Sequence, residues 1–529
     1  MTQARKPTNP KNQTRESQNP SSSSSFSNSG MKLIVPLQGV VQGRGGLLLG
    51  TLVPCALFYF LQLYLKRRRS NLPSSTEPNL PRTSSRTNLS TRGSISRVQV
   101  SRLATQIAKP EDSPYYVGLD RVSEDLYDAV NNPDGILQLG LSDNKLCLDL
   151  IGEWVERNLK GSVMMGSGGV ALGINGIAPY QPFDGLEELK MVLSDFMCQV
   201  MGGSVKFDPS NMVLTAGATP AIEILSFCLA DHGNAFLVPT PYYPGFDRDV
   251  RWRPGVQLIP VHCRRTDNFN LTITALQQAY NQARKRGAKV RGILISNPSN
   301  PVGNVLTPGT LNSLLDFAEE KNIHIIADEV FAGSTYGSEK FVSLAEILDS
   351  DCIDKSRVHI IYGLSKDLSL AGFRVGVIYS FNNRVLAAAK KLSRFSSISA
   401  PTQRLVSSML SDKKFIQDYF EANRRRLRKV HDEFVICLSK LGIECAKSSA
   451  GMYCWADMSG FIQPYSEKGE LDLWEKFLCI AKINITPGSA CHCIEPGWFR
   501  ICFTTITFEE IPRVIERIRL VVESCKSSS

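Results

Sequence analysis

A chain of 529 residues, 43% of them hydrophobic, is long enough for one large two-part domain with a full core or for several small domains. The net charge of +10 is unevenly placed: residues 1–110 hold 16 Lys and Arg against two acidic residues, and the remaining 419 residues hold 44 against 48. The folded part is therefore mildly acidic, which argues against a nucleic-acid partner. Fourteen cysteines without a repeated spacing predict reduced intracellular thiols, and we expect no metal site.

The N-terminal part has three expected segments. Residues 1–44 are rich in Ser, Asn and Pro, with little to bury, so we predict a disordered arm. The apolar segment 45–65, followed by the basic cluster 66–69, just reaches the length of about 20 residues that a membrane helix needs. We predict a membrane anchor that leaves the folded part on the cytosolic face, with peripheral attachment or a cleaved organelle-targeting peptide as alternatives. Residues 66–112 are expected to be a basic, Ser- and Arg-rich linker.

From about residue 210 onward, short apolar runs alternate with helical stretches. Thr307-Pro308 is a strong helix start, because threonine suits the N-cap and proline the first helical position. Strands separated by amphipathic helices predict βαβ units and a mostly parallel sheet, in which ligands bind beyond the carboxyl ends of the strands. The predicted strands are 235–238, 292–296, 323–327, 359–362 and 375–379.

A lysine and an arginine follow the strand predicted at 359–362. Gly363-Leu364-Ser365-Lys366-Asp367 comes directly after it, and Arg374 stands eight residues beyond Lys366. A lysine in a pocket can lose its proton and form a Schiff base. An arginine one short loop away can grip a phosphate through paired hydrogen bonds. The pattern is weak on its own, because surface lysines are common.

Other strand ends carry residues suited to the same ligand. Asp328 can pair with a pyridinium nitrogen and keep it protonated. Asn300 lies in a turn rich in Asn-Pro steps, from which its amide can point into the crevice. Ala218 and Thr219 open a helix whose backbone N–H groups suit an anion, and Tyr243 offers a ring to a flat cofactor. Together the residues at these strand ends predict a binding site for an aromatic phosphate.

The strings that contain these residues resemble the fold-type I enzymes of the aspartate aminotransferase superfamily, and more narrowly the plant 1-aminocyclopropane-1-carboxylate (ACC) synthases. The resemblance covers roughly residues 115–525 and is carried by 214–219, 238–249, 296–303, 328–331, 365–374 and 495–500. It implies an α/β fold in which 113–529 form one aminotransferase class I/II domain. The large part, with the mostly parallel sheet, would be about 185–420, and a smaller α/β part would combine 113–184 with 421–529.

The resemblance also implies the cofactor pyridoxal 5′-phosphate and a homodimer with active sites at the subunit boundary. Lys366 would be the catalytic residue, which binds the cofactor and moves the α-proton of the substrate. Arg500 would hold the substrate α-carboxylate, a natural task for a planar guanidinium. The implied cofactor-binding residues are Asp328 for the ring nitrogen, Asn300 for the ring oxygen, Tyr243 for the ring face, Lys366 for the covalent bond, and Ala218, Thr219, Ser365 and Arg374 for the phosphate.

Several positions depart from the ACC synthase pattern. Asp143, expected with Phe183 to bind substrate, replaces a glutamate and is one methylene shorter. Phe183 and Phe331 stand where the family has tyrosine, and Gly363 where it has serine. Each lost hydroxyl removes a hydrogen bond worth about 1 kcal/mol. Without a phenol at Phe331, we expect the Schiff base of Lys366 to keep its proton to higher pH.

These departures favour an aminotransferase that uses aspartate or an aromatic amino acid as donor. ACC synthesis from S-adenosylmethionine, a step of ethylene biosynthesis, requires the sulfonium substrate in a single pose, so changes in the pocket should harm it first. Transamination needs only removal of the α-proton, return of a proton to the cofactor, and hydrolysis, and the set Lys366, Asp328, Arg374 and Arg500 is intact for these steps. ACC synthase activity and a non-catalytic binding protein of the same fold are the alternatives.

Overall fold

The computed structural model describes residues 100–110, 113–164, 173–348 and 354–526. The predicted arm and the apolar segment 45–65 lie outside these ranges, as does most of the predicted linker, so membrane anchoring and a cytosolic location stay predictions. Within the described ranges, no helix combines the length and the apolar character that a membrane span requires. All described residues belong to a compact unit that begins at Val98.

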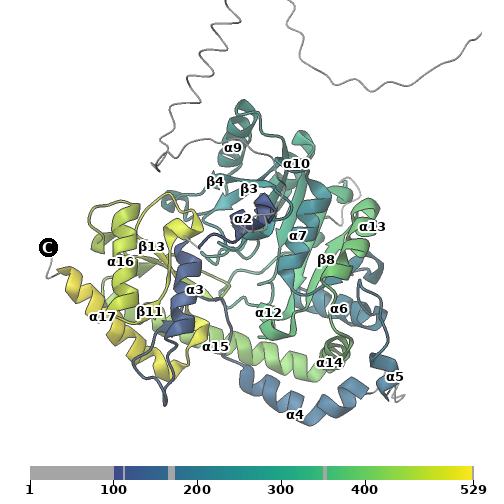
Figure 1. Ribbon diagram of the computed structural model, residues 1–529, viewed down its shortest axis with the longest axis horizontal. Coiled ribbons are helices and arrows are strands. Elements are labelled where there is room, and N and C mark those ends of the chain that lie inside the picture. The colour runs from purple at the N-terminus through teal and green to yellow at the C-terminus, as the bar shows by residue number, and fades with distance from the viewer. Residues whose placement is uncertain (1–99, 111–112, 165–172, 349–353, 527–529) are drawn as a thin grey trace, which may run out of the picture. The chain divides into compact units, whose positions relative to one another are not determined.

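Seven strands form the central sheet, in the order β2-β8-β7-β6-β5-β3-β4 (Figure 1). Only β8 runs against its neighbours β7 and β2, and the other pairs are parallel. The prediction of a mostly parallel α/β sheet is therefore confirmed. The strands are β2 (Met212–Thr215), β3 (Ala235–Thr240), β4 (Gln257–His262), β5 (Val290–Ser296), β6 (His324–Asp328), β7 (Val358–Gly363) and β8 (Gly376–Ser380).

The five strands predicted from apolar runs are β3, β5, β6, β7 and β8, each within two residues of its expected bounds. The sequence did not predict β2 and β4, which form the two edges of the sheet. In β4, only Leu258 and Val261 are buried, and polar residues and a proline interrupt the apolar ones, so no continuous apolar run marks it. The helix expected at Thr307 is α10 (Pro308–Lys321), and the Thr307 hydroxyl accepts a hydrogen bond from the backbone N–H of Thr310 at 3.2 Å.

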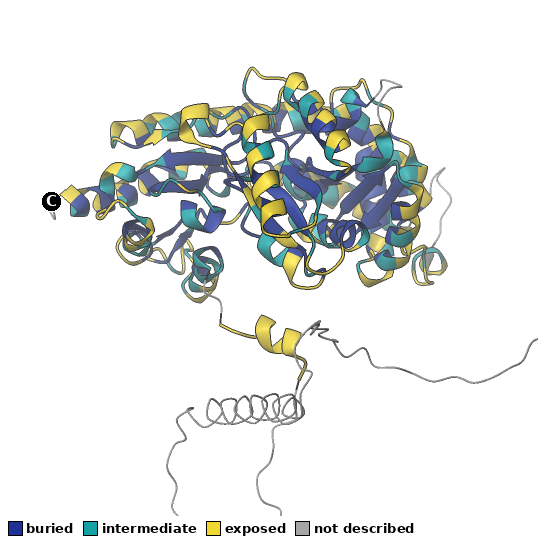
Figure 2. Cartoon of the chain, turned by 90° about the horizontal axis from the view of Figure 1, so that it is seen from above, coloured by how far each residue is buried: buried dark blue, intermediate teal, exposed yellow. Residues whose placement is uncertain are grey.

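Helices cover both faces of the sheet because successive strand residues point to opposite faces. In β5, Leu294 joins the core on one face, whereas Ile293 and Ile295 join the core on the other. Figure 2 shows the strands buried between helices whose outer surfaces are exposed. One face carries α7 (Ala218–Leu229), α8 (Phe246–Arg251) and α13 (Asn383–Leu392); the other carries α4 (Leu148–Met164), α6 (Glu187–Val200), α9 (Ile273–Lys285), α10 and α14 (Ala400–Ser411).

A second core gathers around a small sheet with the order β12-β13-β10-β9. The long helix α15 (Lys413–Lys440) runs through both parts of the chain (Figure 1). Its residues Ile416 and Tyr419 pack in the first core, and Leu427 and Phe434 pack in the second. The elements of this part are α3 (Pro114–Glu124), β1 (Leu137–Gln138), β9 (Glu444–Cys445), β10 (Tyr453–Asp457), α16 (Glu467–Cys479), β11 (Ile483–Asn484), β12 (Thr486–Pro487), β13 (Trp498–Cys502) and α17 (Ile511–Lys526). Four short helices complete the described chain: α2 (Arg102–Ile107), α5 (Gly173–Ile177), α11 (Leu344–Ile347) and α12 (Leu364–Asp367).

The division into a large part at about 185–420 and a smaller part remains a prediction. Helix α4, which that division assigns to the smaller part, packs against α14 of the larger one. Two side-chain hydrogen bonds hold α4 near α14: the Trp154 indole N–H donates to Asp412 at 3.0 Å, and the hydroxyls of Ser162 and Ser408 are 2.9 Å apart.

Candidate active site

Lys366 lies in the one-turn helix α12, directly after the central strand β7. Its Nζ donates a hydrogen bond to the backbone oxygen of Ser142 at 2.7 Å. Burial lowers the pKa of Lys366 to about 8, although the nearby carboxylates of Asp143 and Asp328 act in the opposite sense. A lysine whose amine is neutral for a substantial part of the time at neutral to weakly basic pH can act as a nucleophile or as a base.

Asp328 is the last residue of β6, the strand next to β7, and its side chain is buried. Burial raises the pKa of Asp328 to about 7. The backbone N–H of Val330 donates to its carboxylate over a long 3.4 Å. Asp249, in α8, is close enough for the two carboxylates to interact, and burial together with the charge of Asp328 raises the pKa of Asp249 to about 7. A buried carboxylate held so weakly can accept a strong hydrogen bond from a protonated ring nitrogen.

An anion cradle forms where α7 begins. Gly217, its N-cap residue, has φ 96° and provides no side chain to cap the free N–H groups of Ala218 and Thr219. A Cβ atom on Gly217 would lie 2.2 Å from Nη2 of Arg374, so the guanidinium lies directly against the start of the helix. Arg374 also donates to the Ser365 hydroxyl at 3.4 Å. Helix N–H groups and a guanidinium that face the same space favour the binding of a phosphate.

Gly363 borders this cradle. A Cβ atom added there would lie 3.9 Å from Cβ of Ala218 and 3.1 Å from the backbone oxygen of Val375. The serine that the ACC synthase pattern has at this position would therefore stand at the rim of the cradle. Its absence leaves the N–H groups, Ser365 and Arg374 as the described donors.

Arg500 lies in β13 and is fully buried. Its Nη1 donates to Oδ1 of Asn300 at 3.0 Å, and its Nη2 donates to the backbone oxygen of Gly140 at 2.7 Å and to the Thr486 hydroxyl at 3.3 Å. Its Nε has no hydrogen-bond partner, and none of the ion pairs among the described residues includes Arg500. A buried charge without a counter-ion is costly, so a carboxylate would be a favourable partner for Arg500.

The remaining predicted residues differ in their placement. Tyr243 packs edge to face with Tyr115, 6.2 Å between ring centroids, and Tyr115 in turn lies 5.3 Å from the Arg500 guanidinium. Asp143 is half-buried, and its charge raises the pKa of Lys366, against the larger effect of burial. Phe183 is 39% exposed, and the ring contacts found for it in the described chain, with Tyr180 at 6.4 Å and Arg394 at 5.5 Å, include no other predicted site residue. The structure thus brings together all the predicted site residues except Phe183.

Sequence reasoning missed Tyr453, Cys502, Ser142 and Asp249. Cys502 could have been predicted from the sequence, because residues two apart on a strand share a face and Cys502 follows Arg500 by two. Tyr453 could not have been predicted, because it joins this face only through the pairing of β10 with β13, in which it stands opposite Cys502. Pairing between distant strands cannot be read from either strand alone.

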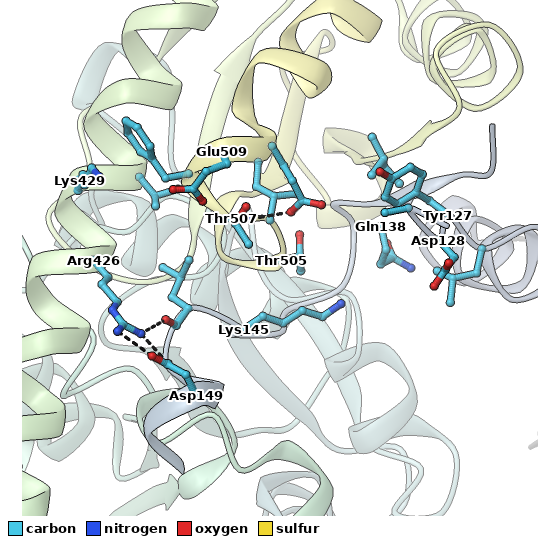
Figure 3. A pocket seen from close by; sticks show the side chains of 18 residues that line it. Tyr127, Asp128, Gln138, Lys145, Asp149, Arg426, Lys429, Thr505, Thr507 and Glu509 are labelled. Carbon is cyan, nitrogen blue, oxygen red and sulfur yellow. Dashed lines mark hydrogen bonds and ion pairs between the residues drawn. The ribbon is translucent and has the colours of Figure 1, made fainter. Parts of the chain in front are cut away.

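A separate open cavity of about 700 Å³ lies between β1, the start of α4, α15 and the chain after β13 (Figure 3). Lys145 lines it, and on one side of the cavity Arg426 donates two hydrogen bonds of 2.6 and 2.8 Å to Asp149. None of the predicted cofactor or substrate residues lines this cavity. In the described part of the chain, no group of three or more His, Cys, Asp or Glu side chains is arranged to hold a metal ion.

Comparison with known proteins points to one family. The model of the family "Aminotransferase class I and II" matches residues 137–518. A relative from Arabidopsis thaliana, named "Probable aminotransferase ACS12", is 62% identical over 94% of this chain and 100% of its own length. A relative from Oryza sativa subsp. japonica, named "1-aminocyclopropane-1-carboxylate synthase 6", is 58% identical over 94% of each chain. The ACC synthase of Malus domestica is 44% identical over 80% of this chain and 90% of its own.

Solved structures agree on the fold. An archaeal alanine:glyoxylate aminotransferase superposes with a TM-score of 0.67 at 20% identity, over 81% of this chain and 98% of its own. A Thermus thermophilus aspartate aminotransferase variant gives a TM-score of 0.64 at 19% identity, over 80% and 100%. The expected resemblance to fold-type I enzymes is therefore confirmed. The chain belongs to the aminotransferase class I and II family, whose members depend on pyridoxal 5′-phosphate.

Proposed function

We propose that this chain is an aminotransferase that moves an amino group from aspartate or an aromatic amino acid to a 2-oxo acid, and that it acts as a homodimer. The observation that carries the proposal is Arg500, a fully buried guanidinium that has no ion pair among the described residues and is close enough to Lys366 to influence its pKa. The carboxylate of an amino acid is the natural counter-ion for it. The Arabidopsis relative with an aminotransferase name supports this assignment.

Three features of the site fit pyridoxal 5′-phosphate. The cradle of Ala218, Thr219, Ser365 and Arg374 offers donors to a phosphate. Asp328, buried and weakly held, suits the ring nitrogen. The amine of Lys366, with its lowered pKa, suits the aldehyde. Asn300 would then contact the ring oxygen and Tyr243 the face of the ring.

When bound, this cofactor supplies an electron sink for the α-carbon of the amino acid. Arg500 orients the substrate by its carboxylate, so that the α-hydrogen lies within reach of one base. Lys366 would take that proton on Nζ and deliver a proton to the cofactor instead of back to the α-carbon, and water would then release the 2-oxo acid. Asp328, as a carboxylate, holds a proton on the ring nitrogen, and its burial strengthens that interaction because little water competes with it.

Asp367 acts indirectly, as a positioning residue. Its buried carboxylate accepts hydrogen bonds from Gly333 N at 2.7 Å, the Ser334 hydroxyl at 2.6 Å and the Tyr362 hydroxyl at 2.8 Å. These bonds tie the loop after β6 to the helix that carries Lys366. Asp328 and Lys366, which stand on these two segments, are thereby held at a fixed separation.

ACC synthase is the second candidate, because the rice relative at 58% identity bears that name. Phe331 and Gly363 weigh against it, since each lacks a hydroxyl that the ACC synthase pattern supplies, and Phe183 lacks a third one, although the described chain does not bring Phe183 to the other site residues. A sulfonium substrate must be held in one pose for elimination and ring closure, and loosened cofactor contacts reduce such precision. Transamination tolerates that loss better.

The full-length chain, loaded with pyridoxal phosphate, is mixed with a panel of amino donors and 2-oxoglutarate. Conversion of the cofactor absorbance to that of the pyridoxamine form, with transfer of nitrogen to the acceptor, is the expected result. Release of methylthioadenosine from S-adenosylmethionine without transfer would replace the proposal with the second candidate. Stable cofactor absorbance with every donor and no product would indicate the non-catalytic alternative. Sedimentation of the same sample tests the homodimer.

A further inference from the structure

Tyr453 faces the candidate active site, and the proposed reaction assigns it neither a cofactor contact nor a substrate contact. It is the first residue of β10 and is 1% exposed. In the antiparallel pairing of β10 with β13, Tyr453 stands opposite Cys502, and Trp455 stands opposite Arg500. Directly opposed residues and residues two apart share one face of a sheet, so Tyr453 and Arg500 project to the same side.

The Tyr453 hydroxyl lies among groups assigned to both cofactor and substrate. Nδ2 of Asn300 donates to it at 3.5 Å, and the Arg500 guanidinium carbon lies 4.6 Å from the centre of its ring. The ring of Phe331 meets it edge to face at 6.0 Å between centroids. Phe331 has no hydroxyl, so of these two touching rings only Tyr453 brings one into the site.

Two further donors lie at this place. In the described chain, Nε of Arg500 has no hydrogen-bond partner. Burial raises the pKa of Tyr453, and the buried Ser142 hydroxyl lies close enough to oppose this rise through a hydrogen bond. The Tyr453 hydroxyl accepts from Asn300, and among the described residues no hydrogen bond has it as the donor. The hydroxyls of Tyr453 and Ser142 together with the Arg500 guanidinium, which has no carboxylate paired to it among the described residues, form a set suited to an oxyanion. Hydrogen bonds to a charged group are about twice as strong as neutral ones.

We propose that Tyr453 is a substrate-binding residue whose hydroxyl donates to the carboxylate held by Arg500. The inference rests on the proposed function only in that the ligand is an amino acid, since the carboxylate of S-adenosylmethionine would meet the same donors. Tyr453 thereby adds a neutral, directional contact to a guanidinium whose Nη atoms already bind Asn300, Gly140 and Thr486. Its hydroxyl fixes where the carboxylate sits.

The test uses the full-length chain loaded with pyridoxal phosphate, as wild type and as Tyr453→Phe. The probes are 2-methylaspartate and 2-methylphenylalanine, which lack the α-hydrogen, and 2-phenylethylamine, which lacks the carboxylate. Binding is followed by the change in cofactor absorbance. We expect the variant to bind the better of the two amino acids about tenfold more weakly, corresponding to about 1.4 kcal/mol, and the amine with unchanged affinity.

Tyr336→Phe is the matched control. It also removes a hydroxyl from a buried tyrosine, but one that bonds to Ser448 at 2.9 Å, outside the site. Its probe affinities should equal those of wild type. Equal weakening of amine and amino acid, or no weakening at all, would overturn the proposal, as would a wild-type chain that binds none of the probes.

A change in the pH at which the cofactor absorbance shifts, without any change in carboxylate affinity, would also overturn it, because the hydroxyl would then serve the cofactor ring oxygen. Failure of the proposed function gives a different result. In that case the wild type binds both amino acid probes, yet transfers no amino group from aspartate or aromatic donors. The effect of Tyr453→Phe on probe affinity remains measurable.

Discussion

Arg500 Nη1 donates to Oδ1 of Asn300 at 3.0 Å, and this bond joins the small sheet to the turn after β5. Because Arg500 occupies the amide oxygen, the amide nitrogen of Asn300 is left as a donor, and it points to the Tyr453 hydroxyl at 3.5 Å. Arg500 is expected to bind substrate and Asn300 the cofactor ring oxygen. The two ligands would therefore contact one hydrogen-bonded network, and a carboxylate that binds Arg500 would also change the strength of the hydrogen bonds of Asn300.

Lys366 is the residue expected to bond covalently to the cofactor. After borohydride reduction of the loaded protein, the wild type should carry the label on the peptide that contains Lys366, and Lys366→Ala should carry none there. Mass spectrometry of the digested protein measures it. Lys414→Ala, on the exposed start of α15, should be labelled as fully as the wild type. Equal labelling of Lys366→Ala and wild type would remove the basis of the assignment.

The pKa of Lys366 predicts how fast the cofactor-free chain takes up pyridoxal phosphate. Only the neutral amine attacks the aldehyde, so the rate should rise with pH through about 8 and then level off. Stopped-flow absorbance measures this rate. The charge of Asp143 raises the pKa of Lys366, so Asp143→Asn should move the profile to lower pH. A midpoint near the ordinary lysine value of about 10.4 would contradict the burial argument.

Asp328 predicts a pH-dependent stability of the cofactor-free chain. Folding raises its pKa to about 7 from an ordinary value of about 3.9. Such a group contributes stability that is fully present below about pH 4 and is lost as the pH rises through about 7. Between about pH 5 and pH 8, the Tm of Asp328→Asn should therefore fall less than that of the wild type. Circular dichroism melts measure this, and the exposed Asp418→Asn should follow the wild type.

Gly217 predicts a specific loss of cofactor affinity. A Cβ atom there would meet Arg374 Nη2 at 2.2 Å, so Gly217→Ala should displace the guanidinium from the cradle. We expect pyridoxal phosphate to bind roughly 10- to 100-fold more weakly, in line with the loss of a charge-assisted contact. Gly233 also has positive φ, 82°, but has open space at its Cβ position. Gly233→Ala therefore shares the backbone strain, and if it weakened binding equally, strain rather than Arg374 would be the cause.

Phe331 predicts the spectrum of the bound cofactor. The ring oxygen lacks the phenol that the ACC synthase pattern supplies, so the cofactor bound to Lys366 should keep its proton to higher pH. Phe331→Tyr restores a donor worth about 1 kcal/mol and should lower the midpoint of the absorbance transition by about one pH unit. A spectrophotometric titration of both proteins measures it. If the wild type already titrates at the low pH of relatives with tyrosine, the hypothesis is wrong.

Strand ends were readable from the sequence because each predicted strand is a short, mostly apolar run. Asp328 and Lys366 could therefore be placed at strand ends, with Arg374 one short loop after Lys366, and the resemblance supplied Arg500. Edge strands β2 and β4 were not predicted, since a run of four residues and a strand with only two buried residues carry weak local signals. The exposed position of Phe183 in a single chain was also not readable, because it depends on how 173–186 fold back.

The sequence by itself determined which residues stand at the carboxyl ends of the parallel strands, because apolar patterning fixes strand and helix within a few residues. Only the tertiary structure decided the substrate side of the site. Ser142, Tyr453 and Arg500 come from separate segments, and the pairing of β10 with β13 and the folding of residue 142 against α12 bring them within hydrogen-bond distance of Lys366 and Asn300. Contacts between distant segments follow from the packing of the whole chain, and no local pattern encodes them.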